Sequence, residues 1–199
     1  MSGAIAGGAG TGLERLRELL LDGGGLLAGL LREEQRGGGP AAASADGRDG
    51  SLGHAAPQPA LLAAAGPRAE GHREEYEMLV EAIYEGYLLH YREPRLLRVP
   101  EADLGLLAGD RLYAIGLAQL VALGDTGAVA ELADTITLSA LAHGADAREL
   151  ADAVWEAGAS AVGWGSSEMH RRAKRMVLEG DPGALDAMRT SVRNGPAPP

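Results

Sequence analysis

Hydrophobic residues recur at helical spacing along the last two thirds of the chain. Between residues 74 and 91, Tyr76, Leu79, Ile83 and Tyr87 follow one another at steps of three or four. The same periodicity predicts further helices over 104–123, 128–143, 147–164, 166–179 and 182–193. No run alternates between polar and apolar residues convincingly enough to be a strand. The pattern therefore predicts an all-α fold, a helical bundle.

Glycine and aspartate stand together at three of the predicted helix boundaries. Gly124 and Gly180 each precede an aspartate, and Gly144 is followed by Asp146. Glycine is common after a helix, and aspartate suits the cap of the next one. Asp146 with Glu149 has the spacing of a capping box, so this pair is expected to begin the helix over 147–164.

The first third of the chain has a different composition. Residues 1–67 are rich in Gly, Ala and Pro. A segment of this composition buries too little apolar surface to offset the conformational entropy that it would lose on folding. We expect a low-complexity, mostly disordered arm over 1–67, with one short helix within 13–31 that is broken at 23–25. The organisation expected is this arm, which would be dispensable for folding, an all-α domain over 68–193 and a disordered tail over 194–199.

The most apolar stretch is 106–125. A helix that is apolar all round is normally buried by neighbours on several sides. Asp110 would then be shielded from water and need a partner. We expect it to form a cap or to pair with Arg95 or Arg98, in preference to supplying a carboxylate for metal binding or proton transfer.

This stretch carries a resemblance to a known family. LLAGDRLYAIGLAQLVALGD at 106–125, followed by AVAELADTITLSALAHG at 128–144, resembles the helix pair after the first aspartate-rich motif of trans-isoprenyl diphosphate synthases. EMLVEAIYEGYLLHY at 77–91 is similar to that family's helix ending in His-Asp-Asp. The resemblance covers about a third of the chain, and it implies a bundle like part of the isoprenoid synthase fold.

The same comparison implies that the chain is catalytically silent. Tyr91, Arg92 and Glu93 follow His90, where the family has the aspartates that hold magnesium. The second DDxxD motif is missing, and Lys174 is the single lysine. Without a metal clamp nothing stabilises a departing diphosphate. The resemblance thus points to the small non-catalytic subunit of heteromeric prenyl synthases, with no metal or cofactor and with a catalytic subunit or a second copy as partner.

Charge and composition exclude several other classes. A net charge of −10 argues against nucleic-acid binding, and the absence of cysteine excludes disulfides and thiolate sites. We see neither a signal peptide nor a transmembrane segment, and we expect a cytoplasmic protein.

Candidate ligand or partner contacts come from the tyrosines of 74–91, from Asp110 and from a basic run at 170–175. They are Tyr87, His90, Tyr91, Asp110, Arg171, Arg172 and Arg175. The tyrosines could line a groove, although core packing explains them as well. The basic run could grip a diphosphate, an acidic partner or a membrane surface, but a solvated helix face is the simpler interpretation.

The glutamates at 74, 77, 81 and 85 form an acidic stripe, which we interpret as a solvated face, because a di-iron bundle would need Glu-x-x-His spacing. Small residues around Trp155, such as Gly158, would let another helix approach closely, within the chain or from a second subunit.

The leading hypothesis is a non-catalytic accessory or regulatory subunit that binds a catalytic partner in isoprenoid or quinone side-chain synthesis. The alternative is a free-standing helical scaffold or protein-interaction module unrelated to isoprenoids. An enzyme that uses Asp110, His90 and the basic run ranks last, because nothing in the sequence places these groups together.

Overall fold

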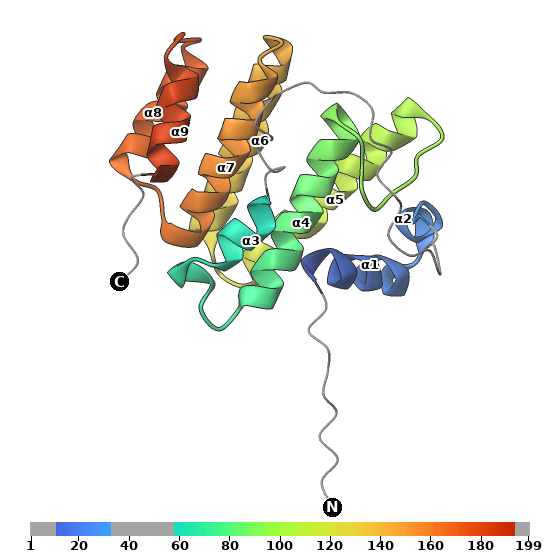
Figure 1. Ribbon diagram of the computed structural model, residues 1–199. Helices are drawn as coiled ribbons and strands as arrows, with labels where there is room; N and C mark the ends of the chain where they lie inside the picture. Colours follow the sequence, from blue (N-terminus) through green and yellow to red (C-terminus); the bar gives the residue numbers. More distant parts are fainter. Residues whose placement is uncertain (1–10, 33–57, 194–199) are drawn as a thin grey trace, which may run out of the picture.

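The computed structural model describes residues 11–32 and 58–193, and in these residues the fold is all-α (Figure 1). The helices are α1 (Gly12–Gly23), α2 (Gly25–Gly29), α3 (Pro59–Ala64), α4 (Arg73–Tyr91), α5 (Ala102–Ala122), α6 (Thr126–Gly144), α7 (Arg148–Trp164), α8 (Glu168–Leu178) and α9 (Ala184–Arg193), with a 3-10 turn at Pro67–Ala69. The described residues hold no strand, only an isolated bridge between Leu31 and Leu97. The predicted helical bundle is confirmed.

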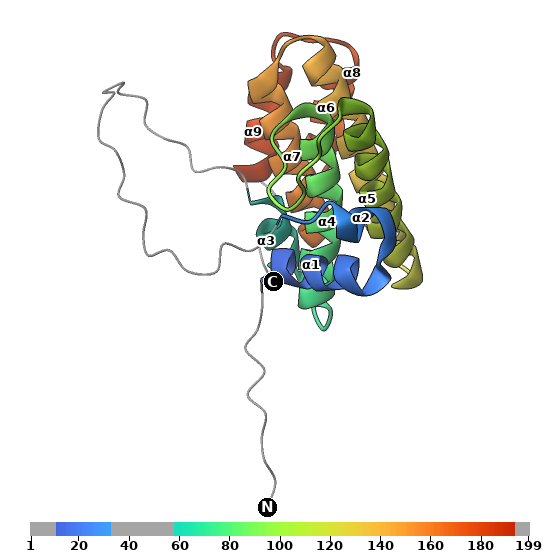
Figure 2. The ribbon, with the colours of Figure 1, turned by 90° about the vertical axis from the view of Figure 1, so that its right-hand side faces the viewer.

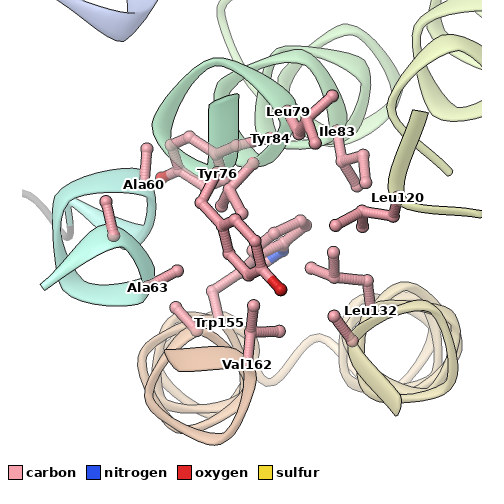
Figure 3. Packing of buried hydrophobic residues seen from close by; sticks show 14 of the residues in the cluster. Ala60, Ala63, Tyr76, Leu79, Ile83, Tyr84, Leu120, Leu132, Trp155 and Val162 are labelled. Carbon is pink, nitrogen blue, oxygen red and sulfur yellow. The ribbon is translucent and has the colours of Figure 1, made fainter. Parts of the chain in front are cut away.

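Two long antiparallel hairpins form the bundle. One consists of α4 and α5, the other of α6 and α7, and α3 lies between α4 and α7 (Figures 1 and 2). Helices α8 and α9 pack on the second hairpin, whereas α1 and α2 lie at the opposite edge, beside the first. The two hairpins meet at a core in which Trp155 from α7 points towards Tyr84 and Ile83 of α4 and Leu132 of α6 (Figure 3).

Glycines set the close approach of the helices inside each hairpin. A Cβ at Gly86 of α4 would lie 2.9 Å from the carbonyl oxygen of Gly109 on α5. In the second hairpin, a Cβ at Gly158 would overlap the side chain of Thr135 on α6. The small residues of α7 therefore serve packing within the chain.

The expected arm over 1–67 is partly folded. The break at 23–25 is where α1 ends and α2 begins, as the sequence predicts, but the helices do not stand apart from the domain. Leu16, Leu20 and Leu27 are buried against α4, α5 and the segment after α4, and α3 contributes Ala60 and Ala63 to the main core. Residue 67 is thus no boundary of the folded unit, because the leucines of this segment form an amphipathic face that the domain covers. The rest of the expected arm, 1–10 and 33–57, and the expected tail lie outside the described residues.

The acidic stripe of α4 is not a solvated face. Glu85 is 0% exposed, and its Oε1 accepts hydrogen bonds from the backbone N–H of Leu96 at 2.6 Å and of Leu97 at 3.3 Å. Arg95 pairs with both Glu81 and Glu85. The spacing of glutamates in a sequence does not show whether backbone N–H groups of another segment will donate hydrogen bonds to them.

About two turns of α4 before Glu85, Glu77 accepts a hydrogen bond from the backbone N–H of Gly12 at 2.7 Å. It also lies 3.7 Å from the guanidinium of Arg15, which pairs with Glu74 as well. The stripe therefore anchors the start of α1 in addition to the loop after α4.

The predicted helix cap is confirmed at Asp125 and wrong at Asp146. Asp125 caps α6 as predicted, with its carboxylate accepting from the backbone N–H of Ala128 at 2.9 Å. Asp146 does not form the expected capping box with Glu149. It has φ 55°, in the left-handed region, and Ala147 takes the cap position of α7 without a side-chain hydrogen bond.

Candidate protein-binding site

Helix α5 is exposed along one side, contrary to the expectation of neighbours on several sides. It buries Ala108, Leu112 and Leu120, but Leu107 is 62% and Val121 57% exposed. Its main neighbour is α4, and in Figure 2 it runs along the outer edge of the bundle. The helix is apolar all round, yet the described chain supplies partners for only part of its circumference.

The exposed apolar residues lie along one side of the helix, which we call the α5 face. At 3.6 residues per turn, Leu107, Ala114, Ala118 and Val121 fall within an arc of about 60°. Contiguous exposed apolar surface is typical of interaction sites, whereas a scattered exposed leucine needs no explanation. The α5 face is therefore a candidate protein-binding surface.

Asp110 lies at the border of the α5 face and is not shielded from water. Its side chain is 69% exposed, and its Oδ1 lies 3.2 Å from His90 Nε2. His90 Nε2 is buried and has no hydrogen-bond partner among the described residues, so this contact is a close approach and not a hydrogen bond. The expected partners Arg95 and Arg98 are not used, because Arg95 binds the glutamates of α4. The His90 ring stacks on Tyr113 at 5.3 Å, which fixes it between α4 and α5.

A second set of polar aromatic side chains joins α4 to α6. The hydroxyl of Tyr87 lies 2.9 Å from His143 Nε2, and the exposed Tyr91 ring stacks on the His143 ring at 4.5 Å. Beside them, Arg92 pairs with Asp152 of α7 at 2.8 Å. Sequence reasoning found Tyr87 and Tyr91 but missed His143, since only the hairpin geometry brings the end of α6 to the end of α4.

The electrostatics of this cluster favour neutral side chains. Burial raises the pKa of Tyr87, so its hydroxyl stays protonated beside the imidazole. Burial, followed by the positive charges of Arg92 and Arg148, lowers the pKa of His143. A hydrogen bond between a neutral phenol and a neutral imidazole ties two helices together and leaves no activated nucleophile. Tyr76, Tyr84 and Tyr87 belong to the core, so packing explains these three tyrosines.

The basic run at 170–175 is largely neutralised by acidic neighbours. His170 is buried with its Nε2 3.2 Å from Glu131, and Lys174 pairs with Glu131 at 2.9 Å and with Asp134 at 2.6 Å. Burial alone would raise the pKa of Glu131, but hydrogen bonds from His170 and Lys174 and the positive charge of Lys174 hold it at about 2. This half of the run is a structural link between α6 and α8.

The three arginines named as candidates remain on the surface of α8. Arg171 and Arg175 share Glu168, at 2.8 and 3.8 Å, and Arg172 is exposed. None of them lies in the Tyr87 or Asp110 groups, so the structure distributes the candidate contacts over three places. The described residues contain no group of three or more side chains suited to hold a metal ion.

A cleft lies away from these groups. It has a volume of about 690 Å³ and opens between the α6–α7 turn and the α8–α9 turn, with Leu141, Val177 and Leu185 in its lining. A smaller cleft of about 410 Å³ lies between the loop after α4 and the start of α5, and His90 and Leu106 line it. The α5 face is a flat strip outside both.

By length and composition, one described helix, α5, is sufficient to cross a bilayer. The core helix of a water-exposed domain passes the same test, and α5 packs along its length on α4.

Comparison with known proteins gives no relative. No family model matches the chain, and no curated protein or solved structure is significantly similar to it.

Proposed function

We propose that this chain is a non-catalytic helical accessory subunit that binds a protein partner through the α5 face. The observation that carries the proposal is the exposure of Leu107 and Val121 on the long, mostly apolar helix α5. A covering protein would remove these side chains from water at about 25 cal/mol per Å² of apolar surface. Asp110 and Arg111 at its borders would supply the polar rim that such interfaces have.

For the partner we propose a catalytic prenyl diphosphate synthase subunit, acting in the cytoplasm. This rests on the resemblance of 77–144 to that family and on the absence of its metal-binding aspartates after His90. The pairing of α4 with α5 is compatible with it, because Gly86 and Gly109 place the two similar segments in contact. If no such synthase binds, the alternative is an interaction module unrelated to isoprenoids that uses the same face.

The test is a binding experiment with a matched surface control. Leu107→Asp should reduce binding to the purified catalytic synthase from the same genome at least about tenfold, since it places a charge in the centre of an apolar contact. Leu178→Asp changes an equally exposed leucine, 60%, on α8 and should leave binding unchanged. Titration by calorimetry measures both, and circular dichroism verifies that each variant is folded.

Activity assays provide a second readout. The chain alone should form no prenyl product from allylic and homoallylic diphosphates with Mg²⁺, and it should raise the activity or change the product length of the synthase. Equal binding of the two leucine variants would overturn the assignment of the α5 face. Product formation by the chain alone would overturn its non-catalytic role.

A further inference from the structure

The charged residues beside the α5 face are arranged in a way that fits one occupant, a second copy of the chain. Asp110 and Arg111 are adjacent in sequence but lie about 100° apart around the helix, so they flank the apolar strip on opposite sides. Arg111 is exposed and forms no ion pair with any residue of the described ranges, and Asp110 is 69% exposed beside its contact with His90. Each α5 face therefore has a negative charge at one edge and a positive charge at the other, at nearly the same position along the helix axis.

The orientation of a symmetric pair follows from this arrangement. In a parallel pair with its two-fold axis along the helices, the left border of one face meets the right border of the other. Asp110 of each copy then lies beside Arg111 of its partner, and the contact occurs twice. In an antiparallel pair, like borders meet, and the two charges never become partners. Only the parallel arrangement is complementary in charge.

The spacing of the face also fits a parallel pair. Leu104, Leu107, Ala114, Ala118 and Val121 lie along this side of α5 at steps of three, seven, four and three residues, and Asp110 and Arg111 flank the seven-residue step. The two alanines would let the helices approach closely. A bilayer is a poorer occupant, because it would have to take up both charges at the edge of the strip.

We propose that the α5 face pairs in parallel with the α5 face of a second copy, with reciprocal contacts between Asp110 and Arg111. The inference rests on the proposed binding role of the α5 face and names a partner for it. A seam of only about 2.5 heptads gives a weak complex, so the dimer would dissociate readily and leave the face free for a heterologous subunit.

Charge variants test the reciprocal contacts. In sedimentation equilibrium at concentrations up to about 100 µM, Asp110→Arg alone and Arg111→Asp alone should each raise the dimer dissociation constant about tenfold, because each places like charges together twice. A mixture of the two variants should form a heterodimer at least as tight as the unaltered dimer. Asp186→Arg on α9 and Arg172→Asp on α8 reverse exposed charges away from the face and should have no effect.

Cysteine variants test the orientation. Because the native chain has no cysteine, any disulfide must join the introduced residues. In a parallel pair, residues 114 and 118 each face their own counterpart, so Ala114→Cys and Ala118→Cys should both form disulfide-linked dimers under mild oxidation. An antiparallel pair would allow at most one of them. Ala145→Cys, in the exposed turn after α6, is the control and should remain monomeric.

The outcomes separate this inference from the proposed function. An unaltered chain that is monomeric at 100 µM, or cross-linking at only one of the two alanines, overturns the parallel dimer. If Leu107→Asp still abolishes binding to the synthase in that case, the proposed function stands. If Leu107→Asp affects neither self-association nor synthase binding, both fail, and partition of the chain into phosphatidylcholine vesicles through α5 would overturn both as well.

Discussion

At the scale of single residues, Glu85 shows how one buried carboxylate organises a loop. It accepts two backbone hydrogen bonds and one from Arg95, so donors from all three residues of the segment at 95–97 converge on it. A buried carboxylate is tolerated only when donors surround it. The neighbouring glutamates share the pattern and differ in burial, so spacing alone could not have singled out this one.

Replacing this residue should be strongly destabilising. Glu85→Ala leaves two buried N–H groups without acceptors and opens a cavity, so we expect the free energy of unfolding to fall by about 3 kcal/mol. Glu93→Ala removes a glutamate that is 88% exposed and should cost less than about 0.5 kcal/mol. Urea unfolding of both variants measures the difference, and similar midpoints would show that Glu85 has no anchoring role.

His143 should give the protein a specific sensitivity to mild acid. Its pKa is lowered in the folded state by burial and by Arg92 and Arg148, so the unfolded chain binds more protons below its ordinary value of 6.5. Stability is therefore full above about pH 6.5 and falls as the pH drops below it. Glu131 and Asp125, whose pKa values are also lowered, contribute only below about pH 4.5.

Melting temperatures at pH 7.5 and 5.5 measure this effect. The decrease between the two should be smaller for His143→Gln than for the unaltered protein, because glutamine does not titrate. Identical decreases would mean that His143 does not contribute to the pH dependence.

At the scale of helices, α1 shows why a low-complexity composition can mislead. Gly, Ala and Pro dominate residues 1–67 as a whole, but Leu13, Leu16, Leu19 and Leu20 of α1 fall on one face. Thr11 and Glu14 form a reciprocal capping box at the start of the helix. Averaging over the segment hides this local signal. The helix therefore belongs to the fold and not to an arm.

Leu16 provides the test of that statement. It is wholly buried, so Leu16→Ala should lower the free energy of unfolding by about 3 kcal/mol. Leu21→Ala on the same helix, at a position that is 52% exposed, should change it by less than about 1 kcal/mol. Thermal unfolding of both variants decides the point, and an unaffected Leu16→Ala would restore the picture of a dispensable segment.

At the scale of the whole molecule, periodicity was sufficient for the helices and not for their surroundings. The six ranges expected after residue 73 match α4 to α9 to within a few residues at each end. Which side of each helix contacts a neighbour depends on how the two hairpins pack. Leucine and alanine occur all round α5, so its sequence does not show which side is buried. For the same reason, the exposed face of α5 and the contact between Tyr87 and His143 could only be found in three dimensions.

Trp155 gives this architecture an optical signature. It is wholly buried at the junction of the hairpins, with its ring centre 4.9 Å from Tyr84 and 5.0 Å from Tyr87 across the interface. The second tryptophan, Trp164, lies at the far end of α7 and is only partly covered. Indole emission depends on the polarity around the ring, so the blue part of the spectrum belongs to Trp155. The fluorescence of the unlabelled chain therefore reports directly on whether the α4–α5 and α6–α7 hairpins are packed against each other or separated.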